Sequence, residues 1–466
     1  MSIRFFQLFL KVPVVLLAAI EGALFFFAPY LASAILVGPQ DVAGATPSGN
    51  LVPTALVFSI FCVASNFAFG LYTTRQRAGT VGLMVRVAAG ALNGAALSAL
   101  VFYAVPSIAV SREVLAATAV IASLFSASTR ALFDRIVDQD TFKSRVLVYG
   151  AGKRAASLLQ LRRRTDQRGF KLVGFMATEG DKVGVPDGKL VPRPDDLLRW
   201  VRDNEIDEIV VSMDDRRRGF PVLELLDCRM AGIDILELPT FLERETGKVR
   251  LDVLNPSWII FGEGFRDSMV QRALERGLDV LASAALLLIS APIMLLAIVA
   301  IKLEDGWRAP VLYRQARVGR YNENFDIVKF RSMRQDAEKP GEAIWATRDD
   351  PRVTRVGAIM RKTRIDELPQ LFAVLRGDMS FVGPRPERPE FVARLEQQIP
   401  YYRERHTVKP GITGWAQLCY PYGASDKDAL EKLQYDLYYV KNRSLLFDLA
   451  ILLQTVEVVL WGKGAR

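Results

Sequence analysis

Four long apolar runs dominate the first 140 residues of this chain and constrain its fold more than any other feature. They cover residues 12–37, 51–71, 82–104 and 114–133. Each is close to the ~20 apolar residues that an α-helix needs to cross a bilayer. We therefore predict a transmembrane α-helical bundle of four helices over residues 1–140.

Positive charge is distributed unevenly between these runs. The loop 38–50 has no lysine or arginine, whereas the next loop has Arg75 and Arg77, and Arg135 and Lys143 follow the fourth run. Because positively charged loops stay in the cytoplasm, this pattern places both ends of the bundle on the cytoplasmic side. The rest of the chain should then begin in the cytoplasm.

Residues 141–240 change to short apolar strands that alternate with helical stretches. The predicted strands are 145–149, 172–176, 208–212 and 233–238, and the predicted helices include 195–204 and 222–230. Such alternation is typical of a parallel, doubly wound sheet. We therefore expect an α/β Rossmann-like domain here.

The turn after the first of these strands reads Gly150-x-Gly152-x-x-Ala155, a weak form of the dinucleotide-binding fingerprint. Its glycines would let a phosphate approach the start of the following helix. The acidic residue expected about 20 residues later is not clear, since the nearest one, Asp166, lies in an arginine-rich stretch. Gly150 and Gly152 are thus weak candidates for cofactor binding, and a domain that keeps the fold without the nucleotide is the favoured alternative.

A linker and a final domain follow. Residues 241–265 have the pattern of a hairpin linker, and residues 266–466 form a domain that contains a fifth apolar segment at 277–301. Pro292 lies inside that segment and removes a backbone donor, so the helix should break there, with Ser290 satisfying one freed carbonyl.

Cations flank the fifth segment on both sides, unlike the charge imbalance of a spanning helix. They are Arg272, Arg276, Lys302 and Arg308. We predict a re-entrant membrane helix over 277–301 that returns to the face it entered. A kinked spanning helix is the alternative, but it would place residues 302–466 outside the cell.

Composition excludes several classes of function. The net charge is +9 and half of the residues are hydrophobic, which favours membrane and phosphate over nucleic acid, for which no motif is visible. The three cysteines lie far apart, so neither a disulfide framework nor a structural zinc site is expected. His406 is the single histidine, and we expect it to be structural or at the edge of a site.

The segment 361–371, RKTRIDELPQL, carries the most informative polar motif. Asp366 and Glu367 lie at an expected helix start among arginines, and a second basic cluster follows at 383–389. Acids that can attack phosphorus or hold a metal, beside arginines that can hold phosphate oxygens, indicate phosphoryl transfer. The alternative is a helix cap on a solvated charged face, since aspartate is a favoured N-cap residue.

A series of further motifs follows the apolar segment. In order they are VLYRQARVGR (311–320), FDIVKFRSM (325–333), LRGDMSFVGPRP (375–386) and VKPGITGWAQ (408–417). This series resembles the bacterial polyprenyl-phosphate sugar-1-phosphate transferases, or monotopic phosphoglycosyl transferases, over residues 265–466. The preceding helices and Rossmann-like domain resemble the large, exopolysaccharide-initiating branch of that family.

The resemblance implies an activity and a location. Such enzymes move a sugar-1-phosphate from a UDP-sugar to undecaprenyl phosphate and release UMP, through a covalent aspartyl intermediate. They act at the bacterial inner membrane with the catalytic domain facing the cytoplasm, in contact with the lipid bilayer and ahead of downstream glycosyltransferases. A homodimer through the Rossmann-like domain is a further expectation.

The resemblance also implies roles for residues. Asp366 matches the nucleophile and Glu367 its partner acid, with Mg²⁺ bound by both; whether Glu367 holds metal or accepts a proton stays open. Candidate substrate-binding cations are Lys329, Arg331, Arg361, Arg385 and Arg388. Independently, an aspartate at a helix N-terminus among cations should stay ionised and nucleophilic.

Two alternative functions remain. A membrane-bound nucleotide-sugar dehydratase would need a Tyr-x-x-x-Lys acid–base pair and a full glycine-rich fingerprint, and the fingerprint here is weak. A non-catalytic scaffold would not need the Asp366–Glu367 pair or its arginines. The apolar C-terminal stretch 444–461 fits either an amphipathic helix in the membrane interface or a packing helix of the core.

Overall fold

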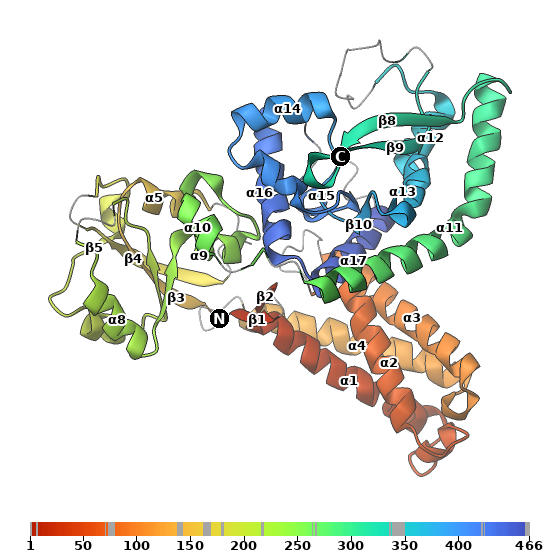
Figure 1. Ribbon diagram of the computed structural model, residues 1–466. Helices are drawn as coiled ribbons and strands as arrows, with labels where there is room; N and C mark the ends of the chain where they lie inside the picture. Colours follow the sequence, from red (N-terminus) through yellow and green to blue (C-terminus); the bar gives the residue numbers. More distant parts are fainter. Residues whose placement is uncertain are drawn as a thin grey trace. The chain divides into compact units, whose positions relative to one another are not determined.

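The computed structural model describes residues 2–5, 8–69, 71–72, 80–137, 143–161, 169–178, 181–215, 219–262, 264–265, 268–334, 337, 350–420, 423 and 425–461. The chain divides into two compact units, Met1–Asn255 and Pro256–Arg466. The first unit contains a helical bundle and an α/β domain, and the second contains a long bent helix with short strands and helices (Figure 1).

The four apolar runs form the predicted bundle. Its helices are α1 (Val12–Leu36), α2 (Val52–Ala68), α3 (Thr80–Ala104) and α4 (Arg112–Val137). Both α1 and α3 pack against α2 and α4. Among the described residues, α1, α3 and α4 are long and apolar enough to cross a membrane, whereas α2 has 17 residues and ends three residues before the predicted position. Short elements accompany them: β1 (Ser2–Phe5), β2 (Leu8–Lys11), η1 (Val42–Ala45) and η2 (Pro106–Ile108).

A buried ion pair joins the first and last helices of the bundle. Arg130 lies 2.8 Å from Oε2 of Glu21, and the same oxygen accepts hydrogen bonds from Tyr72 and Asn66. Ser126 donates to the other carboxylate oxygen at 2.8 Å. A buried charge is tolerated when it is paired and hydrogen-bonded, which explains how Glu21 fits an otherwise apolar helix.

The predicted parallel sheet follows the bundle. It has five strands in the order β5-β4-β3-β6-β7, all paired in parallel. The strands are β3 (Ser144–Tyr149), β4 (Phe170–Met176), β5 (Leu190–Val191), β6 (Glu208–Val211) and β7 (Asp234–Glu237). The helical elements are α5 (Lys153–Ala156), η4 (Ser157–Gln160), η5 (Asp187–Lys189), α7 (Leu197–Asp203) and α8 (Val222–Met230). Strand β5 was not predicted, because two residues are too few to show a pattern.

Both faces of this sheet are covered. Along β3, Val146 and Val148 belong to one buried cluster, while Leu147 and Tyr149 belong to another. Because successive side chains of a strand point to opposite faces, the two clusters lie on opposite sides of the sheet.

The predicted hairpin linker is wrong. Over the described residues of 241–265 the chain forms α9 (Leu238–Thr246), η6 (Leu251–Val253) and α10 (Pro256–Phe261) instead of strands. A proline in the first turn starts α9, and Gly247 ends it in the left-handed conformation. Phe241 and Leu242 are fully buried in a core cluster of the α/β domain, so α9 extends that domain, whereas α10 belongs to the second unit.

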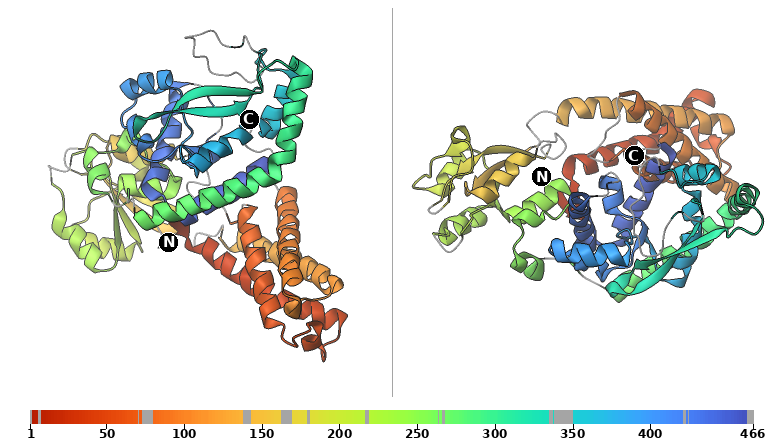
Figure 2. Two further views of the ribbon diagram at one scale, coloured as in Figure 1. Left: turned by 45° about the vertical axis from the view of Figure 1, so that its right-hand side comes forward. Right: turned by 90° about the horizontal axis from the view of Figure 1, so that it is seen from above.

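The fifth apolar segment lies within one 37-residue helix, α11 (Met269–Asp305). The helix is bent, as Figures 1 and 2 both show. Pro292 is inside it, a common cause of a kink. Ser290 does not satisfy a carbonyl as predicted; its hydroxyl contacts Sδ of Met294 at 3.7 Å.

Both ends of α11 are anchored to the same unit. Near its start, Arg276 donates to the carbonyl oxygens of Val374 and Leu375. Near its end, Glu304 accepts hydrogen bonds from the backbone of Arg355 at 2.8 Å and Val356 at 3.0 Å. A straight helix of this length would span about 55 Å, so the bend is what allows both anchors.

The second unit also contains short strands and helices. The strands are β8 (Leu312–Val318) and β9 (Asn324–Phe330), which are antiparallel, and β10 (Ser380–Val382) and β11 (Gly411–Thr413), which are parallel. The helices are η7 (Arg320–Asn322), α12 (Arg355–Thr363), η8 (Ile365–Gln370), α13 (Leu371–Arg376), α14 (Pro389–Gln398), η9 (Tyr402–Thr407), α15 (Trp415–Cys419), α16 (Asp426–Asn442) and α17 (Leu445–Trp461).

The C-terminal helix α17 packs on the core of this unit. Tyr439 donates a hydrogen bond to buried Asp448 at 2.8 Å, and the hydroxyls of Thr413 and Thr455 lie 2.7 Å apart. These contacts favour the packing-helix alternative for the described side chains of α17.

Candidate active site

The Asp366–Glu367 pair lies in the first turn of η8, immediately after α12. Arg364 ends α12 and begins η8 in the left-handed conformation, with φ of 61°. A non-glycine residue in this region is strained and is held there by its surroundings. Because Arg364 is the N-cap residue and no side chain caps η8, Asp366 is not a helix cap.

Asp366 is a buried carboxylate with unused hydrogen-bonding capacity. The residue is 8% exposed, and its Oδ1 has no hydrogen-bond partner among the described residues. Burial, then the charge of Glu367, raises the pKa of Asp366 to about 6, while Lys329 and the nearby arginines oppose this rise. Asp366 is therefore ionised at neutral pH, as predicted, but its surroundings raise its pKa instead of lowering it, so it protonates in mild acid.

Glu367 is the opposite case. Its Oε1 lies 3.0 Å from Arg385 and 3.4 Å from both Lys329 and Arg364. Burial alone would raise the pKa of Glu367, but the charges of these three cations outweigh it and hold that pKa well below its usual range. Glu367 therefore stays a carboxylate and is a weak base.

Three glycines bring Arg385 to the pair. A Cβ at Gly411 would lie 2.1 Å from the backbone nitrogen of Gly383, and one at Gly414 would lie 2.2 Å from its carbonyl oxygen. Side chains at these positions would separate β10 from β11. Arg385 follows this close contact, and its side chain reaches Glu367 in η8.

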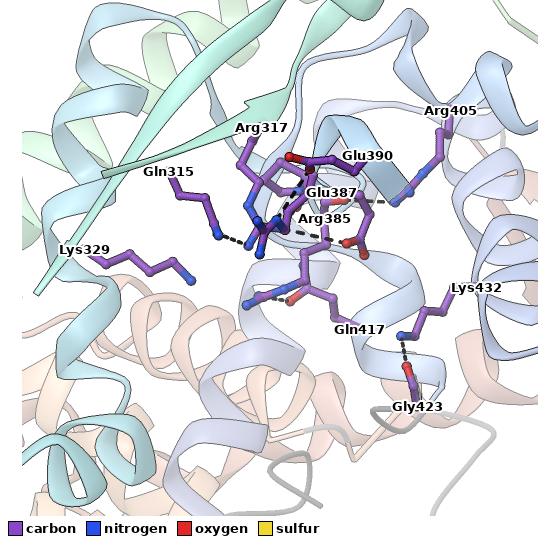
Figure 3. Close-up of polar contacts among 12 residues, drawn as sticks. Gln315, Arg317, Lys329, Arg385, Glu387, Glu390, Arg405, Gln417, Gly423 and Lys432 are labelled. Atoms are coloured by element: carbon purple, nitrogen blue, oxygen red, sulfur yellow. Dashed lines mark hydrogen bonds and ion pairs between the residues drawn. The ribbon is translucent and has the colours of Figure 1, made fainter. Parts of the chain in front are cut away.

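Arg405 holds the backbone of Arg385 (Figure 3). Arg405 donates to the carbonyl oxygen of Arg385 at 2.9 Å and lies 2.8 Å from buried Asp436. The Arg385 side chain then donates to Glu367 at 3.0 Å and to Gln417 at 3.3 Å. Because both ends of Arg385 are fixed, its guanidinium is held in place before any substrate binds.

Asp366 and the predicted cations line one cavity of about 580 Å³, a volume typical of small-molecule sites. Arg361 lines it and has no ion-pair partner among the described residues. Arg331 is bound to Asp305 at 2.5 Å, leaving its Nε and Nη1 without partners in the described structure. Arg388 also lines the cavity, and its Nε lies 3.5 Å from Oε2 of Glu390.

Several residues of this site were not predicted from the sequence. Arg317, Gln315 and Gln417 line the cavity beside Arg385, and Arg317 donates to Gln315 (Figure 3). All three fall inside the quoted motifs, but side-chain direction in β8 and α15 was not visible from the pattern. Arg405 precedes the single histidine and carried no signal of its own.

The residues present fit a magnesium ion. The described residues contain no cluster of three or more metal-ligating side chains. Mg²⁺ typically binds through one or two carboxylates together with substrate phosphates and water. The adjacent carboxylates of Asp366 and Glu367, one with an unpartnered buried oxygen, match that donor set.

Comparison with known proteins agrees with this geometry. A family model described as "Bacterial sugar transferase" matches residues 270–462, and another described as "CoA-binding domain" matches residues 67–225. The chain is 34% identical to "UDP-glucose:undecaprenyl-phosphate glucose-1-phosphate transferase" of Klebsiella pneumoniae, over 67% of each protein. The chain belongs to the bacterial sugar transferase family.

Further relatives in this family differ in how much they share. "UDP-N-acetylgalactosamine-undecaprenyl-phosphate N-acetylgalactosaminephosphotransferase" of Aeromonas hydrophila is 42% identical over 60% of this chain. The match spans 63% of that relative's length. "UDP-glucose:undecaprenyl-phosphate glucose-1-phosphate transferase" of Xanthomonas campestris pv. campestris is 29% identical over 90% of this chain and 88% of its own length.

In the α/β domain, the chain itself fills the glycine-rich turn at Gly150 and Gly152. Asp214 accepts hydrogen bonds from the backbone of Lys153 at 2.9 Å and Arg154 at 3.0 Å, and Asp181 accepts one from Ala151 at 3.0 Å. A dinucleotide phosphate would use these donors. The weak cofactor prediction gains no support, and Asp166 lies outside the described residues.

Two other side chains are placed away from catalysis. The Tyr-x-x-x-Lys spacing of a dehydratase occurs at Tyr149 and Lys153, but Tyr149 is fully buried and its hydroxyl has no partner among the described residues. His406 is buried against Tyr402, and burial, then Arg405, lowers the pKa of His406 to about 3. His406 is therefore uncharged at neutral pH.

Proposed function

We propose that this protein transfers a sugar-1-phosphate from a UDP-sugar to undecaprenyl phosphate at the bacterial inner membrane, initiating exopolysaccharide assembly. The proposal rests on the contrast between the two acids. Oδ1 of Asp366 has no hydrogen-bond partner among the described residues and Asp366 lines a cavity with several arginines, whereas Glu367 contacts three cations. The names of the curated relatives give the donor and acceptor classes.

The reaction would proceed in two balanced steps. A carboxylate oxygen of Asp366 attacks the phosphorus that bears the sugar, the bond to the bridging oxygen breaks, and UMP leaves. A phosphate oxygen of undecaprenyl phosphate then attacks the same phosphorus and releases Asp366, giving the lipid diphosphate sugar. Arg361 and Arg385 would hold the phosphoryl oxygens as charge develops.

Bound Mg²⁺ would neutralise diphosphate oxygens and would be held by Asp366 and Glu367. The lowered pKa of Glu367 favours this ligand role over that of a base. The lipid phosphate needs no strong base, since a phosphate monoester is already largely ionised at neutral pH.

The geometry of α11 supports a re-entrant helix. Its residues are exposed and apolar over much of the surface, including Leu281 at 73%, Leu288 at 79% and Leu296 at 69% exposed. Such a surface requires lipid around it. Because the same compact unit holds both ends of the helix, we propose that α11 enters and leaves the bilayer on the cytoplasmic face.

The purified protein, Mg²⁺, undecaprenyl phosphate and a panel of UDP-sugars should give UMP release with at least one donor. Asp366→Asn should lower that rate by about 10³-fold or more, since the nucleophile is lost. Without the lipid, radiolabelled sugar should remain attached to the wild-type chain but not to the variant. UMP release by Asp366→Asn at the wild-type rate would exclude Asp366 as the nucleophile.

A further inference from the structure

A second cavity lies in the catalytic unit, apart from the first. Its volume is about 140 Å³, and it is lined by the first part of α11, η7, β10, the residues just before β11, and the end of α16. None of the described residues that line it also lines the catalytic cavity. The mechanism above gives it no role.

The lining of this second cavity is strongly basic. Its cations are Arg272, Arg276, Arg320, Lys409 and Arg443. It has two carboxylates, so positive charges exceed negative charges by three. Such an excess in a confined space attracts anions.

Both carboxylates are already engaged by the protein. Oδ1 of Asp279 accepts hydrogen bonds from the hydroxyl of Ser380 and the backbone of Phe381, each at 2.9 Å. Oε1 of Glu275 lies 3.2 Å from Arg443 and accepts from Gln271 at 2.9 Å. Neither acid forms an ion pair with Lys409 among the described contacts.

Lys409 is a cation of this cavity that has no anionic partner among the described residues. Its residue is half-buried, and no hydrogen bond or ion pair holds its ammonium group among the described residues. Burial, then the charges of Arg276 and Arg320, lowers the pKa of Lys409, against an opposing effect of Asp279. A partly buried ammonium among arginines is costly unless an anion joins it.

We infer that this cavity binds a phosphate group through Lys409 and the surrounding arginines. Arginine and lysine together are the usual protein ligands of phosphate oxygens. The phosphate could come from the headgroup of an anionic lipid or from free phosphate. Leu274 and Leu281, on the same part of α11, are 51% and 73% exposed, which brings a lipid surface near the cavity.

The full-length protein can be tested in nanodiscs of phosphatidylcholine with and without phosphatidylglycerol. Native mass spectrometry would count retained phosphatidylglycerol, and a separate titration with inorganic phosphate would follow thermal stability. Lys409→Gln should weaken binding of phosphatidylglycerol or of inorganic phosphate, whichever the wild-type protein binds, about tenfold or more, since a charge-assisted contact is lost. Lys409→Arg should retain it, and Lys427→Gln, at an exposed lysine of α16, is the matched control.

A second readout needs no variant. An amine-reactive reagent should modify Lys409 of the wild-type protein more slowly when the ligand is present, while Lys427 reacts equally with and without it. Protection by phosphatidylglycerol alone would identify the headgroup as the source, and protection by inorganic phosphate would identify free phosphate. Equal modification of Lys409 under all conditions, together with unchanged binding in Lys409→Gln, would overturn the inference.

Discussion

Arg385 donates a hydrogen bond to Glu367 across 3.0 Å, whereas Oδ1 of the adjacent Asp366 has no partner among the described residues. Two neighbouring acids thus occupy opposite electrostatic states. The pKa of Glu367 lies well below its usual range, and that of Asp366 is raised to about 6. In the proposed reaction, Asp366 is the acid that attacks phosphorus, and Glu367 holds the cations around it.

The raised pKa of Asp366 predicts a loss of activity in mild acid. Below a pKa of about 6 the carboxylate is protonated and cannot attack. The value of kcat/KM should therefore be nearly constant above neutral pH and fall about tenfold for each pH unit well below that pKa. Initial rates of UMP release across pH would test this, with circular dichroism to confirm that the protein stays folded. A profile that stays flat down to pH 4 would contradict the assignment.

Replacing Glu367 should move that acidic limit. The negative charge of Glu367 raises the pKa of Asp366, so Glu367→Gln should lower it and shift the acidic fall of the profile to lower pH. The maximum rate should also fall, and more Mg²⁺ should be needed to reach it, because one proposed ligand has lost its charge. A shift of the acidic fall to higher pH would contradict the inference that the charge of Glu367 raises the pKa of Asp366.

Arg385 and Arg388 should differ sharply although both line the cavity. Arg385→Lys removes the guanidinium group that donates to both Glu367 and Gln417, so kcat should fall about 10²-fold. Arg388→Lys changes a side chain that pairs with Glu390, so we expect an effect below about threefold. Equal losses in the two variants would indicate that Arg388 also moves onto the substrate.

Much of the fold and part of the site could be predicted from patterns in the sequence. Apolar runs predicted the bundle, strand–helix alternation predicted the parallel sheet, and the series of motifs predicted one site around Asp366 and Glu367. The opposite pKa shifts of these two acids were not predictable, because they depend on which oxygen Arg385 reaches through folding. Arg405 was missed for the same reason: its partners lie 20 and 31 residues away along the chain.

The proposed membrane topology predicts which cysteines can be labelled from outside the cell. Trp307 follows α11 and is 73% exposed, so Trp307→Cys should resist a membrane-impermeant maleimide in intact cells and react after permeabilisation. Ser48→Cys, in the loop between α1 and α2, should react in intact cells because that loop faces outward in the same topology. Reaction of Trp307→Cys from outside would replace the re-entrant helix with a spanning one.

The aspartates that bind the glycine-rich turn should prevent nucleotides from binding to it. Asp214 satisfies the backbone N–H groups of Lys153 and Arg154, so adding NAD or CoA should not slow hydrogen exchange at those amides in the wild-type chain. Asp214→Ala should speed that exchange and cost about 1 kcal/mol of local stability, as for other lost caps. Asp187→Ala, at an exposed site in η5, should leave the turn unchanged. Slower exchange of the wild-type turn with NAD or CoA would show that a ligand can displace Asp214, and the turn would then be a nucleotide site after all.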